Sequence, residues 1–134
     1  MRILYDKWRV PIDDSVEEGE RPGALVFRGD GKAVTVRHFG DGRRQPRQEG
    51  IGLIKAGGNP RRVTLFEADE CGVYRWAFRH VEELEAVSPR SYFIEAHYVV
   101  EGESLTVAAE HRSPDDAPWA EGVVRRVEFL RGRL

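Results

Sequence analysis

Aromatic rings recur at every second position in one stretch of the chain, at Tyr74, Trp76, Phe78 and His80. Side chains of a β-strand alternate between its two faces, so this spacing predicts a strand over Val73–His80 with an aromatic wall on one side. The residues between the rings are a mixed set that water would tolerate. Two further runs, Val34–His38 and Leu105–His111, end in a histidine in the same phase. Patterning of this kind favours a fold built mainly of β-strands.

Short runs with period two occur along the whole chain, separated by turns that contain glycine or proline. They predict strands over Ile3–Val10, Ala24–Arg28, Ala33–Phe39, Ile51–Lys55, Arg62–Glu67, Val73–His80, Tyr92–Val100, Ser104–His111 and Val123–Arg131. Glycines that can adopt a positive φ in Gly29-Asp30-Gly31-Lys32 predict a compact hairpin turn.

The segments between these strands are expected to be loops, with one exception. Loops are expected over Pro11–Gly23, Gly40–Gly50 and Arg112–Glu121. The exception is Val81–Val87, where a 3.6-residue apolar spacing predicts one or two helical turns that Pro89 ends.

About nine short strands with turns every 8 to 12 residues are typical of a small β-sandwich or barrel. Short connections favour antiparallel neighbours, and a meander hides its edges most completely when it closes on itself. We therefore expect an all-β chain: a small antiparallel up-and-down β-barrel of about 8–9 strands with at most one short helix, forming one domain over residues 1–134. An open or two-sheet form is the alternative. The pattern resembles calycin-type small barrels at the level of architecture, and such a barrel can hold one small ligand.

Composition narrows the classes of protein to which the chain can belong. No apolar run approaches the ~18 residues of a membrane-spanning helix, so no membrane association is expected. The first ten residues include Asp6, Lys7 and Arg9 and no apolar stretch, so no secretory signal is expected. Cys71 is the single cysteine, which suits a reducing cytoplasm. Arginine far outnumbers lysine, as in proteins from GC-rich bacterial genomes, so we expect a bacterial cytoplasmic protein.

Charge is nearly balanced overall but unevenly placed. The net charge of −2 argues against a general nucleic-acid-binding protein, which usually has a basic excess. An acidic block spans residues 13–20 and a basic one spans residues 37–47. Such blocks are either solvated loops or patches that contact a partner.

The order of the strands places three residues near one rim of the expected barrel. In a meander alternate strands end at opposite rims, so His80, Tyr92 and His111 meet at one rim and His38 lies at the other. Histidine and tyrosine at a barrel mouth can orient a carbonyl or exchange a proton near neutral pH, which makes the first three the candidate catalytic residues. The alternative is that both histidines lie half exposed at the rim and have no role in chemistry.

Aromatic side chains are the candidate ligand-binding residues: Tyr74, Trp76, Phe78, Tyr98 and Trp119. They either line a ligand cavity or fill the interior, and Trp119 either caps the barrel mouth or contacts a partner. Glu95 and His97 share one strand face, where they can interact on a partly covered surface or a dimer contact. No spacing of His, Cys, Asp or Glu matches a known metal site, so neither a metal nor another cofactor is expected.

Two classes of function follow from these patterns. The first is a small β-barrel that binds a small apolar or aromatic molecule in its interior, with cofactor-independent acid/base chemistry of the isomerase or cyclase type as an extension. The alternative is a protein–protein interaction module, of an inhibitor or immunity type, that uses its charged outer face. A homodimer is compatible with either class.

Overall fold

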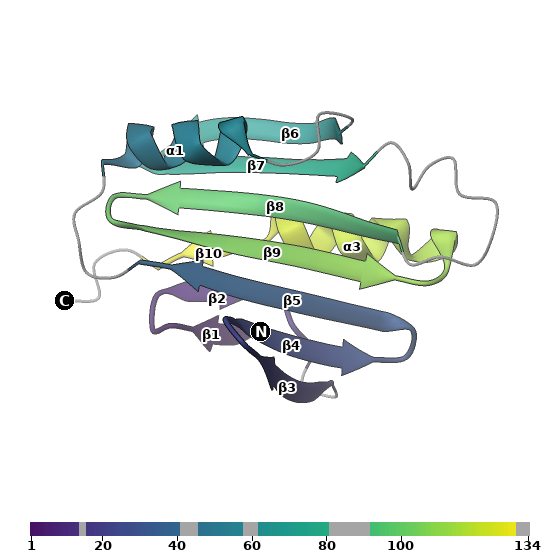
Figure 1. Ribbon diagram of the computed structural model, residues 1–134. Helices are drawn as coiled ribbons and strands as arrows, with labels where there is room; N and C mark the ends of the chain where they lie inside the picture. The colour runs from purple at the N-terminus through teal and green to yellow at the C-terminus, as the bar shows by residue number, and fades with distance from the viewer. Residues whose placement is uncertain (14–15, 41–45, 58–61, 81–91, 131–134) are drawn as a thin grey trace.

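The computed structural model of the 134-residue chain describes residues 1–13, 16–40, 46–57, 62–80 and 92–130, with the side chains of Arg21 and His80 left out. The described part is mostly β-structure, as expected (Figure 1). Its larger sheet has seven antiparallel strands. In spatial order these are β3 (Glu17–Arg21), β4 (Ala24–Gly29), β5 (Lys32–Phe39), β9 (Glu103–His111), β8 (Tyr92–Val100), β7 (Val73–His80) and β6 (Arg62–Glu70).

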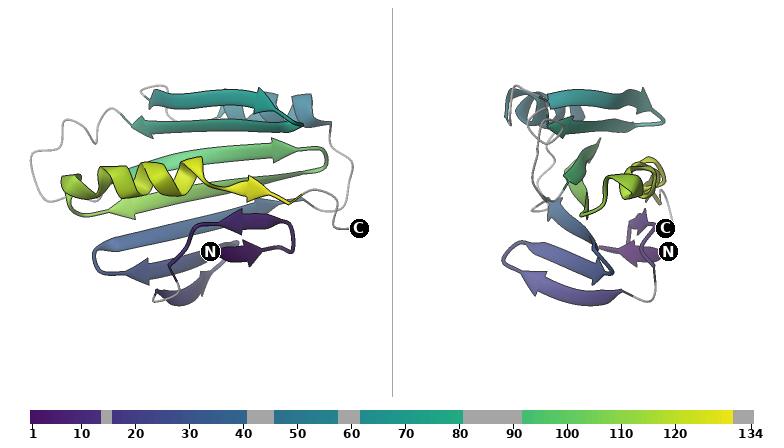
Figure 2. Two further views of the ribbon diagram at one scale, coloured as in Figure 1. Left: turned by 180° about the vertical axis from the view of Figure 1, so that it is seen from behind. Right: turned by 90° about the vertical axis from the view of Figure 1, so that its right-hand side faces the viewer.

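A smaller sheet and two α-helices cover the two faces of the large sheet. The small sheet contains β1 (Arg2–Leu4), β2 (Trp8–Val10) and β10 (Glu128–Phe129). It lies on the same side as α3 (Ala117–Arg125), which follows the short 3₁₀ helix η1 (Pro114–Asp116), whereas α1 (Arg47–Ala56) lies on the opposite side (Figure 2). None of the described helices has the length and apolar content needed to cross a bilayer.

The strand order corrects the expected meander. Two meanders are present, β3-β4-β5 and β6-β7-β8-β9, and they are joined by pairing of β5 with β9 instead of β5 with β6. The chain between β5 and β6 includes α1, so these two strands are no longer linked by a short turn and need not pair. Within the described residues no ladder joins β3 to β6. Closure into a barrel therefore stays a prediction, while the two-sheet alternative describes what is seen.

Helix formation corrects three further expectations. Residues 51–55, expected as a strand, lie in α1, and most of the loop expected at 112–121 is helical. The strand expected over Val123–Arg131 shrinks to β10, because residues 123–125 complete α3. The chain thus exceeds the expected limit of one short helix. In α3 a proline occupies the first turn, where its missing N–H costs nothing, and Ala120, Val123 and Val124 form the buried stripe.

The N-terminal hairpin also differs from the single strand expected over Ile3–Val10. Tyr5 and Asp6 both have positive φ angles, 54° and 60°, and reverse the chain between β1 and β2. The acidic stretch that follows, expected as a loop, contains the edge strand β3. The helical turns expected over Val81–Val87 lie outside the described residues.

Register divides the large sheet into two faces. Antiparallel partners point to the same side, so Trp76 shares a face with its partner His97, and Arg75 shares the other face with Tyr98. Continuing across β9, His97 pairs with Thr106, which in turn pairs with Arg37. We call this the α1 face, because α1 packs on it, and the opposite one the α3 face.

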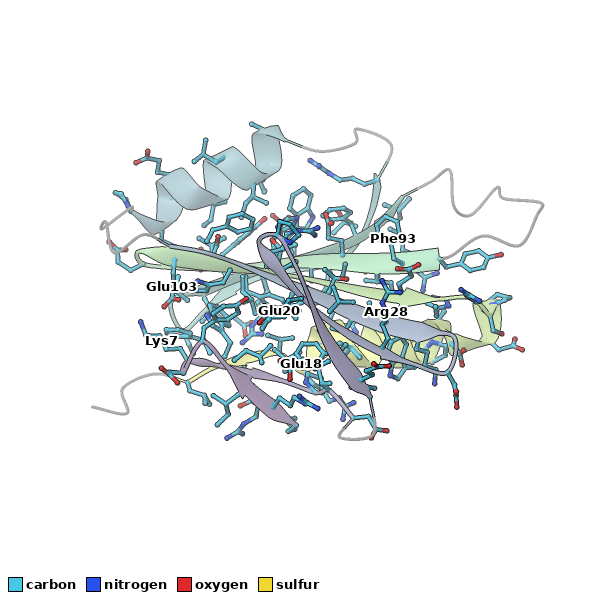
Figure 3. All side chains as sticks on the ribbon, turned by 60° about the horizontal axis from the view of Figure 1, so that its bottom comes forward. Lys7, Glu18, Glu20, Arg28, Phe93 and Glu103 are labelled. Carbon is cyan, nitrogen blue, oxygen red and sulfur yellow. The ribbon has the colours of Figure 1, made fainter. Side chains whose placement is uncertain are left out.

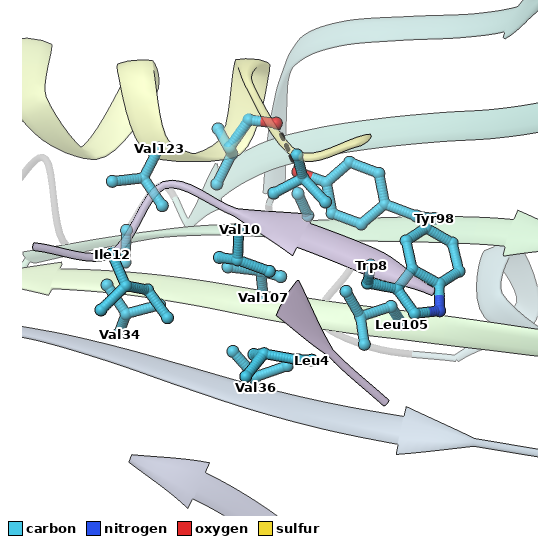
Figure 4. Close-up of a cluster of buried hydrophobic side chains, with 14 of the residues drawn as sticks. Leu4, Trp8, Val10, Ile12, Val34, Val36, Tyr98, Leu105, Val107 and Val123 are labelled. Atoms are coloured by element: carbon cyan, nitrogen blue, oxygen red, sulfur yellow. Dashed lines mark hydrogen bonds between the residues drawn. The ribbon is translucent and has the colours of Figure 1, made fainter. Parts of the chain in front are cut away.

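The main core lies between the α3 face, the small sheet and α3. Trp8 and Tyr98 are fully buried at its centre, with their ring centroids 6.2 Å apart (Figure 4). The Tyr98 hydroxyl donates a hydrogen bond to the carbonyl oxygen of Val124, so its polar end is satisfied by α3. Branched side chains such as Val36 and Val107 fill the space around the rings.

Candidate functional site

Helix α1 packs on a second, smaller apolar cluster on the other side of the sheet. Ile51 and Ile54, three residues apart and therefore on one side of the helix, pack against buried side chains of β7 and β8. Those side chains are Tyr74, Trp76, Phe78 and Val99. No residue of α1 is itself buried, so the helix rests on the sheet and leaves space beside it.

Arg62 fixes the C-terminal end of α1. Its guanidinium donates hydrogen bonds to the carbonyl oxygens of Gly57, at 2.7 Å, and Lys55, at 3.1 Å. The same group lies 4.3 Å from the centre of the Trp76 ring, where a cation is attracted to the aromatic face. One side chain thus satisfies two carbonyls near the end of the helix and covers an aromatic ring.

A second set of contacts joins α1 to β6 and β7. Lys55 lies 2.6 Å from Glu67, which also accepts a hydrogen bond from the Tyr74 hydroxyl. Hydrogen bonds from Lys55 and Tyr74 lower the pKa of Glu67. Burial, together with the bond to Glu67, raises the pKa of Tyr74, so this hydroxyl stays protonated and acts as a donor.

An open groove of about 440 Å³ lies between α1 and the adjoining strands β5, β9 and β8. Part of its wall is apolar and exposed: Leu53 on α1 is 62% exposed and Phe39 at the end of β5 is 55% exposed. Hydroxyl, imidazole and charged groups contribute the rest of the lining. We call it the α1 groove, lined by Arg37, Phe39, Gly50, Leu53, Ile54, Glu95, His97, Ser104 and Thr106.

Three polar side chains form a line of close polar contacts in this groove. Thr106 Oγ1 lies 3.0 Å from His97 Nδ1, and His97 Nε2 lies 3.3 Å from Glu95 Oε2. The interaction expected between Glu95 and His97 from their shared strand face is therefore confirmed. In the neutral tautomer that has its proton on Nε2, facing the carboxylate, Nδ1 accepts a hydrogen bond from the Thr106 hydroxyl.

Aromatic rings hold the imidazole of His97 in place. The Phe78 ring is nearly parallel to it at 5.7 Å, and the Trp76 ring lies 6.2 Å away. Both nitrogens of His97 are already engaged, by Thr106 and by Glu95. Chemically, the line can pass a proton from a hydroxyl through an imidazole towards a carboxylate.

The structure separates the aromatic residues that sequence analysis grouped together. Tyr74, Trp76 and Phe78 lie beneath α1, whereas Tyr98 is 0% exposed in the core on the α3 face. They therefore cannot line one cavity. The phase of the alternation within each strand is clear from sequence. The pairing of Arg75 with Tyr98 is not, and this pairing is what puts Tyr98 on the opposite face from Trp76. The residues that alternate with the rings, which were expected to be tolerated by water, form the opposite face of β7. Two of them, Val73 and Ala77, belong to the main core.

Tyr92 and His111 do lie together, as the strand order predicted. They are paired directly across β8 and β9, and their rings stack with centroids 5.6 Å apart. His111 is 3% exposed, and its Nδ1 donates to the carbonyl oxygen of Ser113 at 2.6 Å. The backbone of His80 ends β7, but its side chain lies outside the described residues. His38 is at the opposite end of β5 from the partner of His111, as expected.

Trp119, the last candidate ligand-binding residue, lies on α3 instead of in a loop. Lys32 is 5.2 Å from the centre of its ring, and both line a pocket of about 240 Å³. Ile12, Phe27 and Val34 form part of the apolar lining of this pocket. The location of Trp119 beside this opening is compatible with the capping role that the sequence favoured, which stays a prediction.

Phe39 and Thr106 were not candidate site residues in the sequence, and Arg37 stood out only as the first residue of the basic block at 37–47. A signal was present in Ala33–Phe39, where Thr35, Arg37 and Phe39 form the more polar set of alternating positions. An aromatic residue in phase with polar residues on one strand face indicates a surface that binds a ligand or a partner. Among the described residues, no three His, Cys, Asp or Glu side chains gather closely enough to hold a metal ion.

Neither a protein-family model nor a curated protein sequence matches the chain.

Proposed function

We propose that the protein binds a small aromatic or apolar molecule in the α1 groove. The observation that supports this proposal best is the pair of large apolar side chains, Leu53 and Phe39, that stand exposed beside hydrogen-bonding groups. Exposing such side chains to water is unfavourable, and a bound apolar molecule would remove them from it. The volume of about 440 Å³ lies within the range of small-molecule sites.

This proposal places the ligand outside the large sheet instead of inside a closed barrel. Trp8 and Tyr98 are fully buried at the centre of the α3 face, so protein side chains already fill that region. Should the sheet close into the calycin-like barrel that the sequence predicts, the α1 groove would still lie on its outer surface. Tyr74, Trp76 and Phe78 would then support the binding site from below instead of lining a central cavity.

Acid/base chemistry is an extension of the same proposal. Thr106 would present a hydroxyl to the ligand, and His97, oriented by Glu95, would take up or return its proton. The Tyr92–His111 pair stays the alternative location for such chemistry. Its support is the ring stacking and the buried imidazole of His111.

The test of binding uses N-phenyl-1-naphthylamine, an uncharged aromatic probe that becomes fluorescent in apolar surroundings. We expect enhanced fluorescence with the unmodified protein and loss of that enhancement in Leu53→Asp, which places a charge in the groove wall. The matched control is Ile3→Asp on β1, because Ile3 is 53% exposed and lies outside the groove. No enhancement with the unmodified protein, or equal enhancement with both variants, contradicts the proposal.

A protein–protein interaction module is the second candidate function. It is supported by β3, an edge strand with Glu17, Glu18 and Glu20 in five residues, since a charged edge can steer a basic partner. A pull-down with the Glu18→Gln, Glu20→Gln double variant tests this candidate. A partner captured equally by the double variant would contradict a role for this edge.

We also propose a bacterial cytoplasmic location and a homodimer. The single, exposed Cys71 supports a reducing compartment, and the edge strand β6 offers a surface for a second copy. Sedimentation at two protein concentrations tests the dimer, which a constant monomer mass would contradict.

A further inference from the structure

Arg37 gives one end of the α1 groove a positive charge. It points to the α1 face from β5, directly across from Thr106 on β9, and Ser104 lies two residues from Thr106 on that same face. Among the described residues Arg37 has no ion pair or hydrogen-bond partner. A guanidinium with the Ser104 hydroxyl nearby is a favourable arrangement for a carboxylate or sulfonate, which accepts several hydrogen bonds at once.

The rest of the groove restricts what the anion can be attached to. Leu53, Ile54 and Phe39 present apolar surface beside this cationic end. A bound molecule that uses both therefore has an aromatic or aliphatic body and one charged end.

Glu95 restricts the number of negative charges. It lies in the same groove on β8, on the far side of β9 from Arg37, and its carboxylate is held by His97. A second negative charge on the ligand would approach Glu95 without a second free cation in the described lining to offset it. The lining thus favours a monoanion over a dianion such as a phosphate monoester.

We propose that the ligand of the α1 groove is a monoanionic amphiphile, an aromatic or aliphatic carboxylic acid, whose anionic group binds Arg37 and whose apolar body packs on Leu53 and Phe39. This inference rests on the proposed function and names the chemical class of its ligand.

Two probes that differ by one anionic group test the inference. 8-Anilinonaphthalene-1-sulfonate has the same rings as N-phenyl-1-naphthylamine plus one sulfonate, which stands in for the carboxylate. We expect Arg37→Met to weaken binding of the sulfonate probe by about tenfold, the scale of a charge-assisted hydrogen bond, and to change binding of the uncharged probe less than twofold. Arg37→Lys should retain part of the affinity for the sulfonate probe, and added salt should weaken the binding of the sulfonate probe only.

The matched control is Arg28→Met. Arg28 is an exposed arginine on the same face of the neighbouring strand β4, outside the groove (Figure 3). Arg28→Met should leave the affinities for both probes unchanged. Urea unfolding of each variant confirms that the fold is intact.

The outcomes separate this inference from the proposed function. If the uncharged probe binds and is lost in Leu53→Asp, but Arg37→Met leaves the sulfonate probe unaffected, the groove binds ligands and the inference about the anion is wrong. Equal loss of sulfonate binding in Arg28→Met and Arg37→Met also overturns it, since a diffuse positive surface would then explain the effect. If neither probe responds to Leu53→Asp, the proposed function fails and the inference fails with it.

Discussion

Glu103 is the most heavily hydrogen-bonded carboxylate described in the structure. It accepts hydrogen bonds from His38 Nε2 at 2.5 Å, Lys7 Nζ at 3.3 Å and Trp8 Nε1 at 3.4 Å (Figure 3). Burial alone would raise the pKa of Glu103, but these three donors together lower it. Since Lys7 and Trp8 belong to the N-terminal hairpin and His38 to β5, this one carboxylate joins the small sheet to the large one.

The lowered pKa of Glu103 predicts a dependence of stability on pH. A carboxyl group whose pKa is lower in the folded state contributes stability above its unfolded pKa, and this contribution is lost as the pH falls through the folded value. We expect Glu103→Gln to reduce the free energy of unfolding at pH 7 by about 2 kcal/mol, because hydrogen bonds to a charged group are lost. The difference from the unmodified protein should shrink below pH 4.

Urea unfolding monitored by tryptophan fluorescence at pH 7 and pH 3 checks this expectation. Glu110→Gln is the matched control, because Glu110 is an exposed glutamate on the same strand. A difference between Glu103→Gln and the unmodified protein that is as large at pH 3 as at pH 7 would show that the charge of Glu103 is not responsible.

At the scale of the elements, the β6–β7 turn contains a residue poorly matched to its backbone. Cys71 has a φ of 54° and is followed by Gly72 at 77°, the conformation in which Asn-Gly is the preferred pair. Cys71→Asn should therefore raise the free energy of unfolding by about 0.5 kcal/mol. Thermal unfolding measures this gain in stability. The control is Cys71→Ala, which removes the thiol without the conformational advantage and should show no gain.

Helix α1 should depend on Arg62 more than on its own sequence. It contains Gly50 and Gly52, begins without a side-chain cap and buries no residue. We expect Arg62→Met to increase hydrogen exchange of the α1 amides by about tenfold while leaving exchange in β8 and β9 nearly unchanged. The control is Arg112→Met, an exposed arginine outside α1 and its contacts. Uniform acceleration across the sheet would instead indicate global destabilisation.

The same elements show how far sequence can predict this fold. Alternation located β4, β5, β7, β8 and β9 closely, because each combines period two with a glycine-containing turn. It failed at residues 51–55, where Ile51, Leu53 and Ile54 fit a strand as well as a helix. The contact that decides, Ile51 and Ile54 on the rings of β7, is tertiary. It also failed at α3, where Pro118 indicated a loop although proline is tolerated in a first helical turn.

The candidate site was less accessible to prediction than the fold. The proximity of Glu95 and His97 follows from their positions two apart on one strand, and Tyr92 with His111 follows from counting strands. Thr106 and Arg37 join the site only through cross-strand pairing of β8, β9 and β5, which no local pattern specifies. Sequence therefore supplied parts of the site within one strand and missed those that depend on register.

For the whole molecule, the acidic edge strand β3 has a consequence for solubility. Charged side chains on an exposed edge oppose pairing with another chain, and Glu18 and Glu20 stand along this one (Figure 3). We expect the Glu18→Thr, Glu20→Thr double variant to form larger assemblies than the unmodified protein does at the same concentration. Light scattering measures the association, and Glu110→Thr, away from this edge, is the control. Unchanged scattering by the double variant would show that the edge is protected in another way.

The seam between β5 and β9 also bears on how the chain acquires its fold during synthesis. Val36 on β5 pairs with Val107 on β9. The first meander, β3-β4-β5, therefore cannot pair with β9 until most of the chain has left the ribosome. Until then β5 has an open hydrogen-bonding edge, and of the elements that cover its apolar side chains only the N-terminal hairpin of β1 and β2 has been synthesised. Contacts so distant in sequence slow folding. We therefore expect this protein to need protection by chaperones during translation more than its modest length would indicate.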